Sequence, residues 1–238
     1  TPGEENSQVS DFGDPTINEY SLEFNGSGDY VVLPYDIILQ PAYQLTYSAW
    51  ASAEGWTSLN RSKILSNYES GGYILEVRED QTIGCTIKNH PSTMSYTSYP
   101  LSMLNEGEFH HFACVYDSGN LKLYVDGELK DEDDQGDYQL GYYYGMPIFI
   151  GAEPVGMFAG DITDYYDGKI DEITIWNRVL TAEEIQEKMI EQEQLIPASE
   201  YGLIGYWPFD EGPKDEVGNS AYDVSALSNH GNIIGATY

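Results

Sequence analysis

The chain has 238 residues, which is long for an average domain but within the range of a single all-β sandwich. Its 40 acidic and 10 basic residues give a formal charge of −30, which repels phosphate backbones and anionic lipid surfaces, so we expect no nucleic-acid or membrane partner. The 21 Tyr, 24 Gly and 11 Pro favour short strands with tight turns, and no stretch approaches the ~20 apolar residues of a membrane helix.

The N-terminal half is predicted to consist of strands and turns. Residues 1–18 are polar and aperiodic, which indicates a tail or linker, and we expect a single domain over 19–238. Tyr20, Leu22 and Phe24 alternate with polar residues, and the turn at 25–29 leads into the apolar segment 30–33, as in a hairpin. Further short strands are predicted at 45–51, 63–66, 73–77 and 82–87.

A second hairpin is the clearest in the chain. It joins 108–116 to 121–125, with Leu121, Leu123 and Val125 on one face and Lys122 and Tyr124 on the other. The acidic run 131–137 and the tyrosines 142–144 are expected to form a solvated excursion. A strand follows at 147–152, and 153–166 is predicted to be a long irregular loop, a length that suggests a functional role.

The segment 167–186 is predicted to be a turn, a strand, a second turn and a capped helix. Thr181 at the N-cap and Glu184 three residues later form a capping box, so the one expected helix lies near 181–193. Strands at 203–209 and 231–236 close the chain. We therefore predict an all-β fold of two antiparallel sheets packed as a sandwich, with one short surface helix.

Asp171 lies in the predicted strand of this segment. If that strand is regular, its carboxylate shares the face of Ile173 and Ile175. A carboxylate there is costly unless a cation, a basic side chain or several amide donors meet it.

The two cysteines, Cys85 and Cys114, both lie in strand-like segments. They form either a disulfide between neighbouring strands, if the compartment is oxidising, or two buried thiols that act as small apolar residues. No spacing typical of a zinc site is present.

Four stretches together resemble the laminin-G-like, concanavalin A-like jelly rolls of secreted and cell-surface proteins. The stretches are 21–31, 109–117 with 123–127, 168–177, and 205–212 with 228–231. The resemblance implies a jelly roll of two curved sheets with ligand-binding loops at the rims, in an extracellular or cell-surface protein. The family often opens with the segment found here at 205–212, and we expect this segment to complete the present domain rather than to start a following repeat.

The resemblance also makes enzyme activity worth testing, because related jelly rolls include glycoside hydrolases. Retaining hydrolases need two carboxyl groups roughly 5–5.5 Å apart, and Glu-x-Asp-x-x-Glu on one strand supplies them. No predicted strand has this spacing: Glu132 and Asp134 lie in the acidic run, while the adjacent Asp171 and Glu172 should point to opposite faces. A Gly-x-Ser-x-Gly nucleophile motif is also absent from the sequence. We expect no catalysis.

A structural calcium site is implied by the resemblance. In the family such a site is often built from the first hairpin turn and the Asp of the Gly-x-Ile-Asp-Glu strand, which here correspond to Asn25 or Asp29 and to Asp171. The alternative is that Asp171 caps loop amides without a metal.

Ligand contacts are expected in the long loops. Sugar rings stack on exposed aromatic faces and their hydroxyls pair with carboxylates. The expected rim residues are Tyr142, Tyr143, Tyr144, Asp161, Asp164, Tyr165, Tyr166 and Trp56.

The leading hypothesis is a non-catalytic, calcium-containing extracellular module that binds carbohydrate or a cell-surface glycan, in adhesion or as part of a larger multidomain protein. The alternative is a protein-interaction or spacer domain without sugar affinity, and a glycoside hydrolase ranks last.

Overall fold

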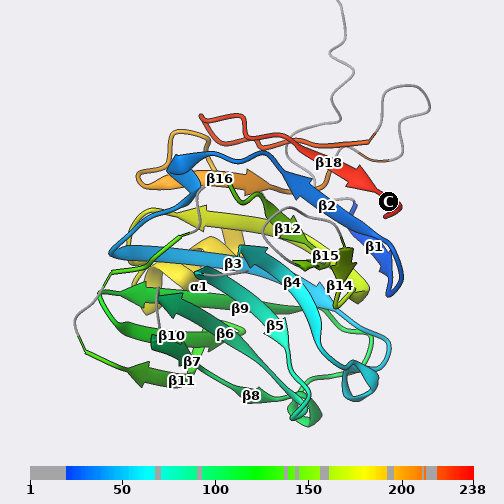
Figure 1. Ribbon diagram of the computed structural model, residues 1–238, viewed down its shortest axis with the longest axis horizontal. Coiled ribbons are helices and arrows are strands. Elements are labelled where there is room, and N and C mark those ends of the chain that lie inside the picture. Colours follow the sequence, from blue (N-terminus) through cyan, green and yellow to red (C-terminus); the bar gives the residue numbers. More distant parts are fainter. Residues whose placement is uncertain are drawn as a thin grey trace, which may run out of the picture.

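The computed structural model describes residues 20–67, 71–89, 93–136, 139–142, 145–155, 161–191, 196–210, 212 and 219–238. Within these residues the strands form one sheet of seven, one of nine and a two-stranded ribbon, and α1 (Ala182–Glu191) is the one α-helix (Figure 1). The predicted sandwich of two antiparallel sheets with a single short helix is confirmed. No helix in the described part of the chain is both long and apolar enough to span a bilayer.

In the seven-stranded sheet, the strand at 167–176 lies second from one edge and is paired on both sides. Its strands follow the order β1 (Leu22–Asn25), β15 (Asp167–Trp176), β3 (Gln44–Ser52), β9 (His110–Asp117), β10 (Asn120–Val125) and β11 (Glu128–Asp134). β16 (Leu203–Trp207) pairs with the second half of β15, beyond the part that pairs with β1. The segment at 205–212 thus contributes to this sheet, as expected.

The nine-stranded sheet packs against the first. Its strands follow the order β17 (Ser220–Ala221), β18 (Gly231–Ile234), β2 (Tyr30–Leu33), β12 (Ile148–Ile150), β4 (Ser62–Asn67), β5 (Gly72–Val77), β6 (Thr82–Asn89) and β7 (Thr93–Tyr96), and β8 (Tyr99–Pro100) also pairs with β6. Short 3₁₀ turns are η1 (Ile37–Leu39), η2 (Trp56–Ser58) and η3 (Leu101–Met103). The ribbon consists of β13 (Glu153–Val155) and β14 (Asp161–Thr163), so the prediction of a wholly irregular loop over 153–166 is wrong.

The main core lies between the two sheets, and the second hairpin shows how the sequence builds it. Leu121, Leu123 and Val125 of β10 point into this core, as the alternation predicts, whereas Tyr124 packs in a second apolar cluster. Cys85 of β6 and Cys114 of β9 form a disulfide between the two sheets, which resolves the choice between a bond and two thiols.

The second apolar cluster lies on the outer face of the seven-stranded sheet, where Ile185 of α1 packs with Trp176 and Tyr206. The predicted capping box is present: the Glu184 N–H donates to Thr181 Oγ1 (3.2 Å), and the Thr181 N–H donates to Glu184 Oε2 (2.8 Å). α1 is therefore fixed both by its cap and by its buried face.

β15 is not a regular strand, so the predicted orientation of Asp171 is wrong. The pairing of β15 with β3 shifts between Asp171 and Thr174, and Glu172 has a φ of 52°. This β-bulge puts two residues between the core-facing Ile170 and Ile173 where a regular strand has one. Glu172 accepts a hydrogen bond from Tyr206 Oη on the outer face; burial raises the pKa of both groups, and the nearby charge of Asp171 raises both further. The adjacent carboxyls therefore do not point to opposite faces.

The acidic run is also a strand rather than a solvated excursion, because β11 spans most of it. Two of its carboxylates bridge to the edge of the other sheet. Asp133 Oδ2 accepts from Ser95 Oγ (2.7 Å) and the Tyr96 N–H (3.1 Å), and Asp131 Oδ2 accepts from the Ser98 N–H (2.8 Å). These charge-assisted bonds close one side of the sandwich and satisfy edge N–H groups.

Candidate functional site

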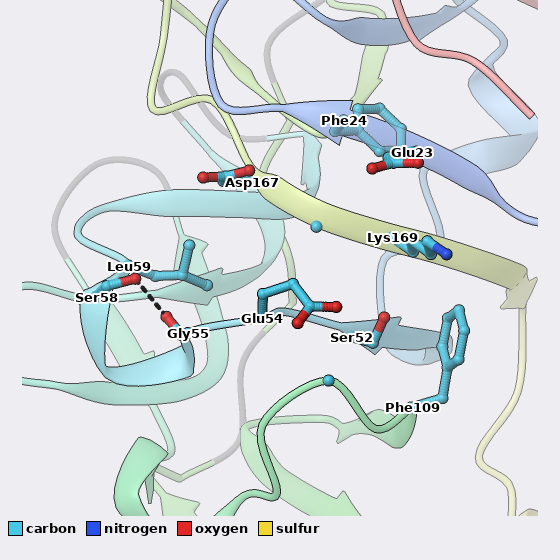
Figure 2. Close-up of a pocket in the computed structure, with 12 residues that line it drawn as sticks. Glu23, Phe24, Ser52, Glu54, Gly55, Ser58, Leu59, Phe109, Asp167 and Lys169 are labelled. Atoms are coloured by element: carbon cyan, nitrogen blue, oxygen red, sulfur yellow. Dashed lines mark hydrogen bonds between the residues drawn. The ribbon is translucent and has the colours of Figure 1, made fainter.

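A cleft of about 210 Å³ lies beside the start of β15 (Figure 2). Glu23, Glu54, Asp167 and Lys169 line it together with Phe109, and Figure 2 shows the Lys169 ammonium directed away from Asp167. Among the described residues, no group of three or more His, Cys, Asp or Glu side chains could hold a metal ion. The carboxylates of this cleft therefore form no such group.

A larger hollowed region, which we call the sheet groove, runs over β4, β5, β6 and β7 beside the ribbon. It comprises two overlapping hollows of about 340 and 430 Å³. Its lining residues are Arg61, Lys63, Glu76, Val77, Arg78, Glu79, Asp80, Thr86, Met94, Tyr96 and Glu153. At roughly twice the volume of the small cleft and with two exposed apolar side chains, it is the better site for a ligand of several rings.

Lys63 forms the centre of the groove floor. Its side chain is only 4% exposed, and its Nζ lies 2.7 Å from Glu76 Oε2, 3.2 Å from Glu153 Oε2 and 3.3 Å from Asp164 Oδ2. Burial disfavours the ammonium, but the carboxylates outweigh it and raise the pKa of Lys63. The floor is thus a fixed array of one cation and three acids from three separate segments.

The acids of this array differ in their protonation. Burial raises the pKa of Glu153. Burial acts in the same sense on Glu76, but the charge of Lys63 and bonds from Lys63 and Thr86 reverse it, so the pKa of Glu76 is lowered. Such a divergence is found in the acid and base pairs of hydrolases. Here, however, one ammonium bonds to both carboxylates and stabilises their ionised forms.

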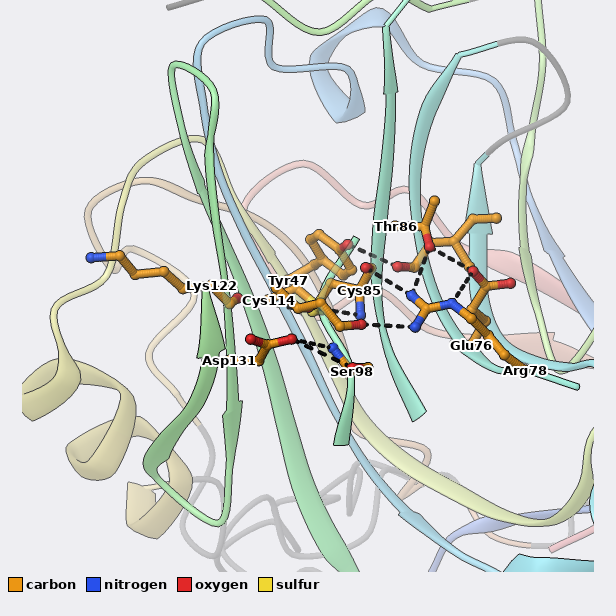
Figure 3. The surroundings of a disulfide bond; sticks show 11 residues. Tyr47, Glu76, Arg78, Cys85, Thr86, Ser98, Cys114, Lys122 and Asp131 are labelled. Carbon is orange, nitrogen blue, oxygen red and sulfur yellow. Dashed lines mark hydrogen bonds and ion pairs between the residues drawn. A yellow bond between two sulfur atoms is a disulfide. The ribbon is translucent and has the colours of Figure 1, made fainter. Parts of the chain in front are cut away.

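Tyr96 lies at the rim of the groove, and one face of its ring packs on the Arg78 guanidinium. Tyr96 as a residue is 58% exposed, and the Arg78 guanidinium lies 5.5 Å from the centroid of its ring. Arg78 is itself anchored, since Nε donates to Glu76 (3.1 Å), Nη1 to the Thr97 carbonyl (2.8 Å) and Nη2 to the Cys85 carbonyl (3.0 Å) (Figure 3). The ring therefore presents its other face to solvent in a fixed orientation.

Gly84 makes this anchoring possible. A Cβ at this position would lie 1.9 Å from the Thr97 carbonyl oxygen and 3.1 Å from Arg78 Nη1. Only glycine at position 84 lets β6 lie this close to the Thr97 carbonyl and to Arg78.

Three of the predicted rim aromatics are in the core instead. Trp56 and Tyr166 are fully buried, with Trp56 Nε1 donating to the Asn105 carbonyl and Tyr166 Oη to the Ser52 carbonyl. Tyr142 packs on the same core and donates to the Pro41 carbonyl (2.8 Å). The expectation of exposed stacking rings is wrong for these three residues, because the ends of the sandwich need large rings to fill them.

The other predicted rim residues have different fates. Tyr143 and Tyr144 lie outside the described residues. Asp161 is exposed on β14 and Tyr165 is half-buried, and neither lines the groove. Asp164 contacts the groove floor through Lys63 and Arg61, with its φ of 53° turning the chain back toward β4.

The predicted calcium ligands do not converge. Asn25 and Asp29 share the β1–β2 turn, where the Asn25 N–H donates to Asp29 Oδ2 (3.0 Å) and the Ser27 N–H to Asn25 Oδ1 (2.7 Å). Asp167 is the residue of β15 opposite Asn25, and Asp171 lies four residues further along, roughly 13 Å away at ~3.3 Å per residue. These three residues do not fit one calcium site, and calcium binding itself stays a prediction.

The main groove residues were missed by the sequence analysis although a signal existed. Lys63 and Glu76 are charged residues inside predicted apolar strands, at 63–66 and 73–77, and they are direct partners in the register of β4 and β5. Opposite charges at such positions indicate a polar patch on a sheet face.

The sequence of most of the chain matches a known protein family. Residues 25–186 match the family described as the concanavalin A-like lectin/glucanases superfamily. The chain belongs to this superfamily. A search of curated proteins finds no match to the sequence.

Solved structures of the superfamily's fold are similar over most of the chain. A protein of Bacteroides ovatus ATCC 8483, provisionally described as carbohydrate-binding, has 19% identity and a TM-score of 0.68 over 91% of this chain and 58% of its own. The heptameric SAP-like pentraxin of Limulus polyphemus has 17% identity and a TM-score of 0.53 over 70% of this chain and 79% of its own. The binding domain of botulinum neurotoxin DC, in complex with SialylT, has 15% identity and a TM-score of 0.53 over 72% of this chain and 42% of its own. At these identities the similarity shows a shared lectin-like fold.

Proposed function

We propose that the protein is a non-catalytic carbohydrate-binding module whose ligand lies in the sheet groove. The observation that carries the proposal is Tyr96, an exposed ring fixed by Arg78 beside a floor of ordered charged groups. A rigid ring offers an apolar surface to the C–H face of a sugar, and the neighbouring carboxylates accept from its hydroxyls. The two similar structures described with carbohydrate or SialylT support this class of ligand.

We further propose that the module works outside the cell, on a free or cell-surface glycan, in adhesion or within a larger multidomain protein. The inter-sheet disulfide supports an oxidising compartment. The chain spans 58% of the length of the Bacteroides ovatus protein, in keeping with a module of a longer chain.

Hydrolysis is the second candidate, because the pKa of Glu153 is raised and that of Glu76 is lowered across one ammonium. A hydrolase would need Glu153 as a proton donor, whereas its Oε2 accepts from Lys63. Binding without turnover is therefore the expected result.

Glycan-array screening followed by titration calorimetry tests the proposal on Tyr96→Ala. Loss of ring stacking is expected to weaken binding about tenfold or more, which corresponds to ~1.4 kcal/mol. The matched control is Tyr201→Ala, because Tyr201 is 82% exposed and its ring is 5.8 Å from the Arg178 guanidinium, yet it lies outside the groove.

Three outcomes would contradict the proposal. Equal weakening by both variants would remove the groove from it, and the absence of glycan binding would favour a spacer or protein-interaction domain. Release of reducing ends from a bound polysaccharide, abolished by Glu153→Gln, would instead establish hydrolysis.

A further inference from the structure

The cationic groups on the groove floor have little hydrogen-bonding capacity left for a ligand. The three N–H groups of the Lys63 ammonium are matched by carboxylates of Glu76, Glu153 and Asp164. Arg78 donates to Glu76 and to two carbonyls, and Nη2 also donates to Thr86 Oγ1 (2.8 Å). Four of the five donors of the Arg78 guanidinium are thus used within the protein.

Arg61 is the exception, and it stands at the mouth of the groove. Its side chain is 55% exposed, with Nε 3.3 Å from Asp164 Oδ2 and Nη1 3.4 Å from Glu79 Oε1. Its remaining N–H groups face solvent between two carboxylates, where they can reach a hydroxyl more readily than a second anion.

Acceptors, by contrast, are abundant. Glu76 is occupied, since it accepts from Lys63, Arg78 and Thr86. Among the described residues, Glu153 contacts a donor only through Oε2, Glu79 only through Oε1 and Asp80 only through Oδ1. Each leaves its second oxygen for a donor supplied by the ligand.

The net negative charge of the groove also disfavours an anionic ligand. Four acidic and three basic side chains line the groove, and the carboxylate of Asp164 adds a further negative charge beside Lys63 and Arg61. The whole chain carries a formal charge of −30, so an acidic polymer is repelled during approach as well as in the groove.

We infer that the sheet groove selects uncharged saccharides, whose hydroxyl groups donate to the remaining carboxylate oxygens, over saccharides that carry carboxylate or sulfate groups. The inference rests on the proposed function and names its ligand class. Sugars with acid groups would bring acceptors to a site that already has them in excess and would find no unpaired floor cation.

The test compares neutral and acidic polymers that share a backbone. The pairs are hydroxyethyl-cellulose with carboxymethyl-cellulose, dextran with dextran sulfate, and fully methyl-esterified pectin with polygalacturonic acid, measured by affinity electrophoresis at about 20 and 300 mM NaCl. We expect a neutral member to bind at least tenfold more tightly than its acidic partner at low salt, with the difference narrowing at high salt. An acidic member that binds as tightly as its neutral partner overturns the inference and leaves the proposed function standing. No binding to any polymer overturns both.

A variant that alters the floor charge gives a second, independent test. Glu153→Gln combined with Asp164→Asn leaves Lys63 with one carboxylate partner, so affinity for the acidic members should rise at least tenfold relative to the neutral ones. The matched control is Glu187→Gln combined with Asp117→Asn, which removes the same charges from exposed positions outside the groove. An equal shift in both double variants would mean that overall charge, rather than the groove, sets the preference and would overturn the inference.

Discussion

Removing the disulfide is the perturbation whose magnitude follows most directly from the structure. Cys85 and Cys114 are fully buried, join β6 to β9 and enclose a sequence separation of 29 residues. Closing a loop of this length removes about 12 cal/mol/K from the unfolded chain in the chain-entropy model, or ~3.6 kcal/mol at 25 °C. The Cys85→Ala, Cys114→Ala double variant should lose about this much free energy of unfolding, and its melting temperature should fall by roughly 7–14 °C.

The assay is urea unfolding of the oxidised wild type and the double variant, followed by tryptophan fluorescence and circular dichroism. Alkylation of the unfolded, unreduced wild type is the control, and it should modify no cysteine. A loss below about 1 kcal/mol, or two alkylated thiols, would refute the reasoning. Because the Cys85 carbonyl accepts from Arg78, the variant should also bind glycan more weakly at temperatures where it is still folded.

Four further predictions concern charged groups. Burial lowers the pKa of His111 to about 4, so the stability that its neutral form contributes is complete above pH 6.5 and is lost as pH falls toward 4. Between these pH values the wild type should lose up to ~3 kcal/mol more free energy of unfolding than His111→Gln, as measured by urea titration. Burial raises the pKa of Glu172, so the wild type loses stability as pH rises above about 4.5; Glu172→Gln should therefore melt higher than wild type at pH 7.5 but not at pH 4, and equal melting at pH 7.5 would contradict this. Asp133→Ala should weaken glycan binding more than Asp131→Ala at similar cost in stability, because only Asp133 holds the Tyr96 N–H; equal effects in calorimetry would argue against it. Asp171→Asn should leave unchanged any rise in melting temperature that calcium produces and EDTA reverses, because Asp171 does not converge with Asn25 and Asp29; a calcium-dependent rise that Asp171→Asn abolishes would show that Asp171 is a ligand after all.

The central strands were predictable because their residues are apolar on both faces of the sheet. In β9, Phe112, Cys114 and Tyr116 point into the main core, while Ala113 and Val115 pack in the second cluster. A segment buried on both sides is apolar throughout, and its strand character does not depend on distant contacts.

Features that depend on a partner segment were not predictable. The bulge in β15 places Glu172 at a positive φ, which no Gly or Asn marks in the sequence. The acidic β11 has the composition of a solvated loop, and it is ordered by its pairing with β10 and by N–H groups of the other sheet's edge, such as that of Tyr96. Trp56 follows polar residues and still fills the core, because η2 folds back over the end of the sandwich.

The candidate groove contains residues that the local sequence indicates and residues that only tertiary folding brings together. Lys63 and Glu76 could have been identified as paired charges within strands. Glu153 and Asp164 come from the ribbon and the segment after it, and their approach to Lys63 is a product of tertiary folding that no local pattern encodes.

The pairing of β2 with β18 has a consequence for biosynthesis. Val31 is paired with Ile233 and Glu23 with Thr237, so strands from the start of the described chain complete their hydrogen bonding only with residues about 200 positions later. Until β15 and β18 have emerged from the ribosome, β1 has no neighbour in its sheet and β2 has only β12. Contacts this distant in sequence are slow to form. Cys85 and Cys114 leave the ribosome well before the C-terminal strands. Their disulfide can therefore hold β6 and β9 together before β18 pairs with β2.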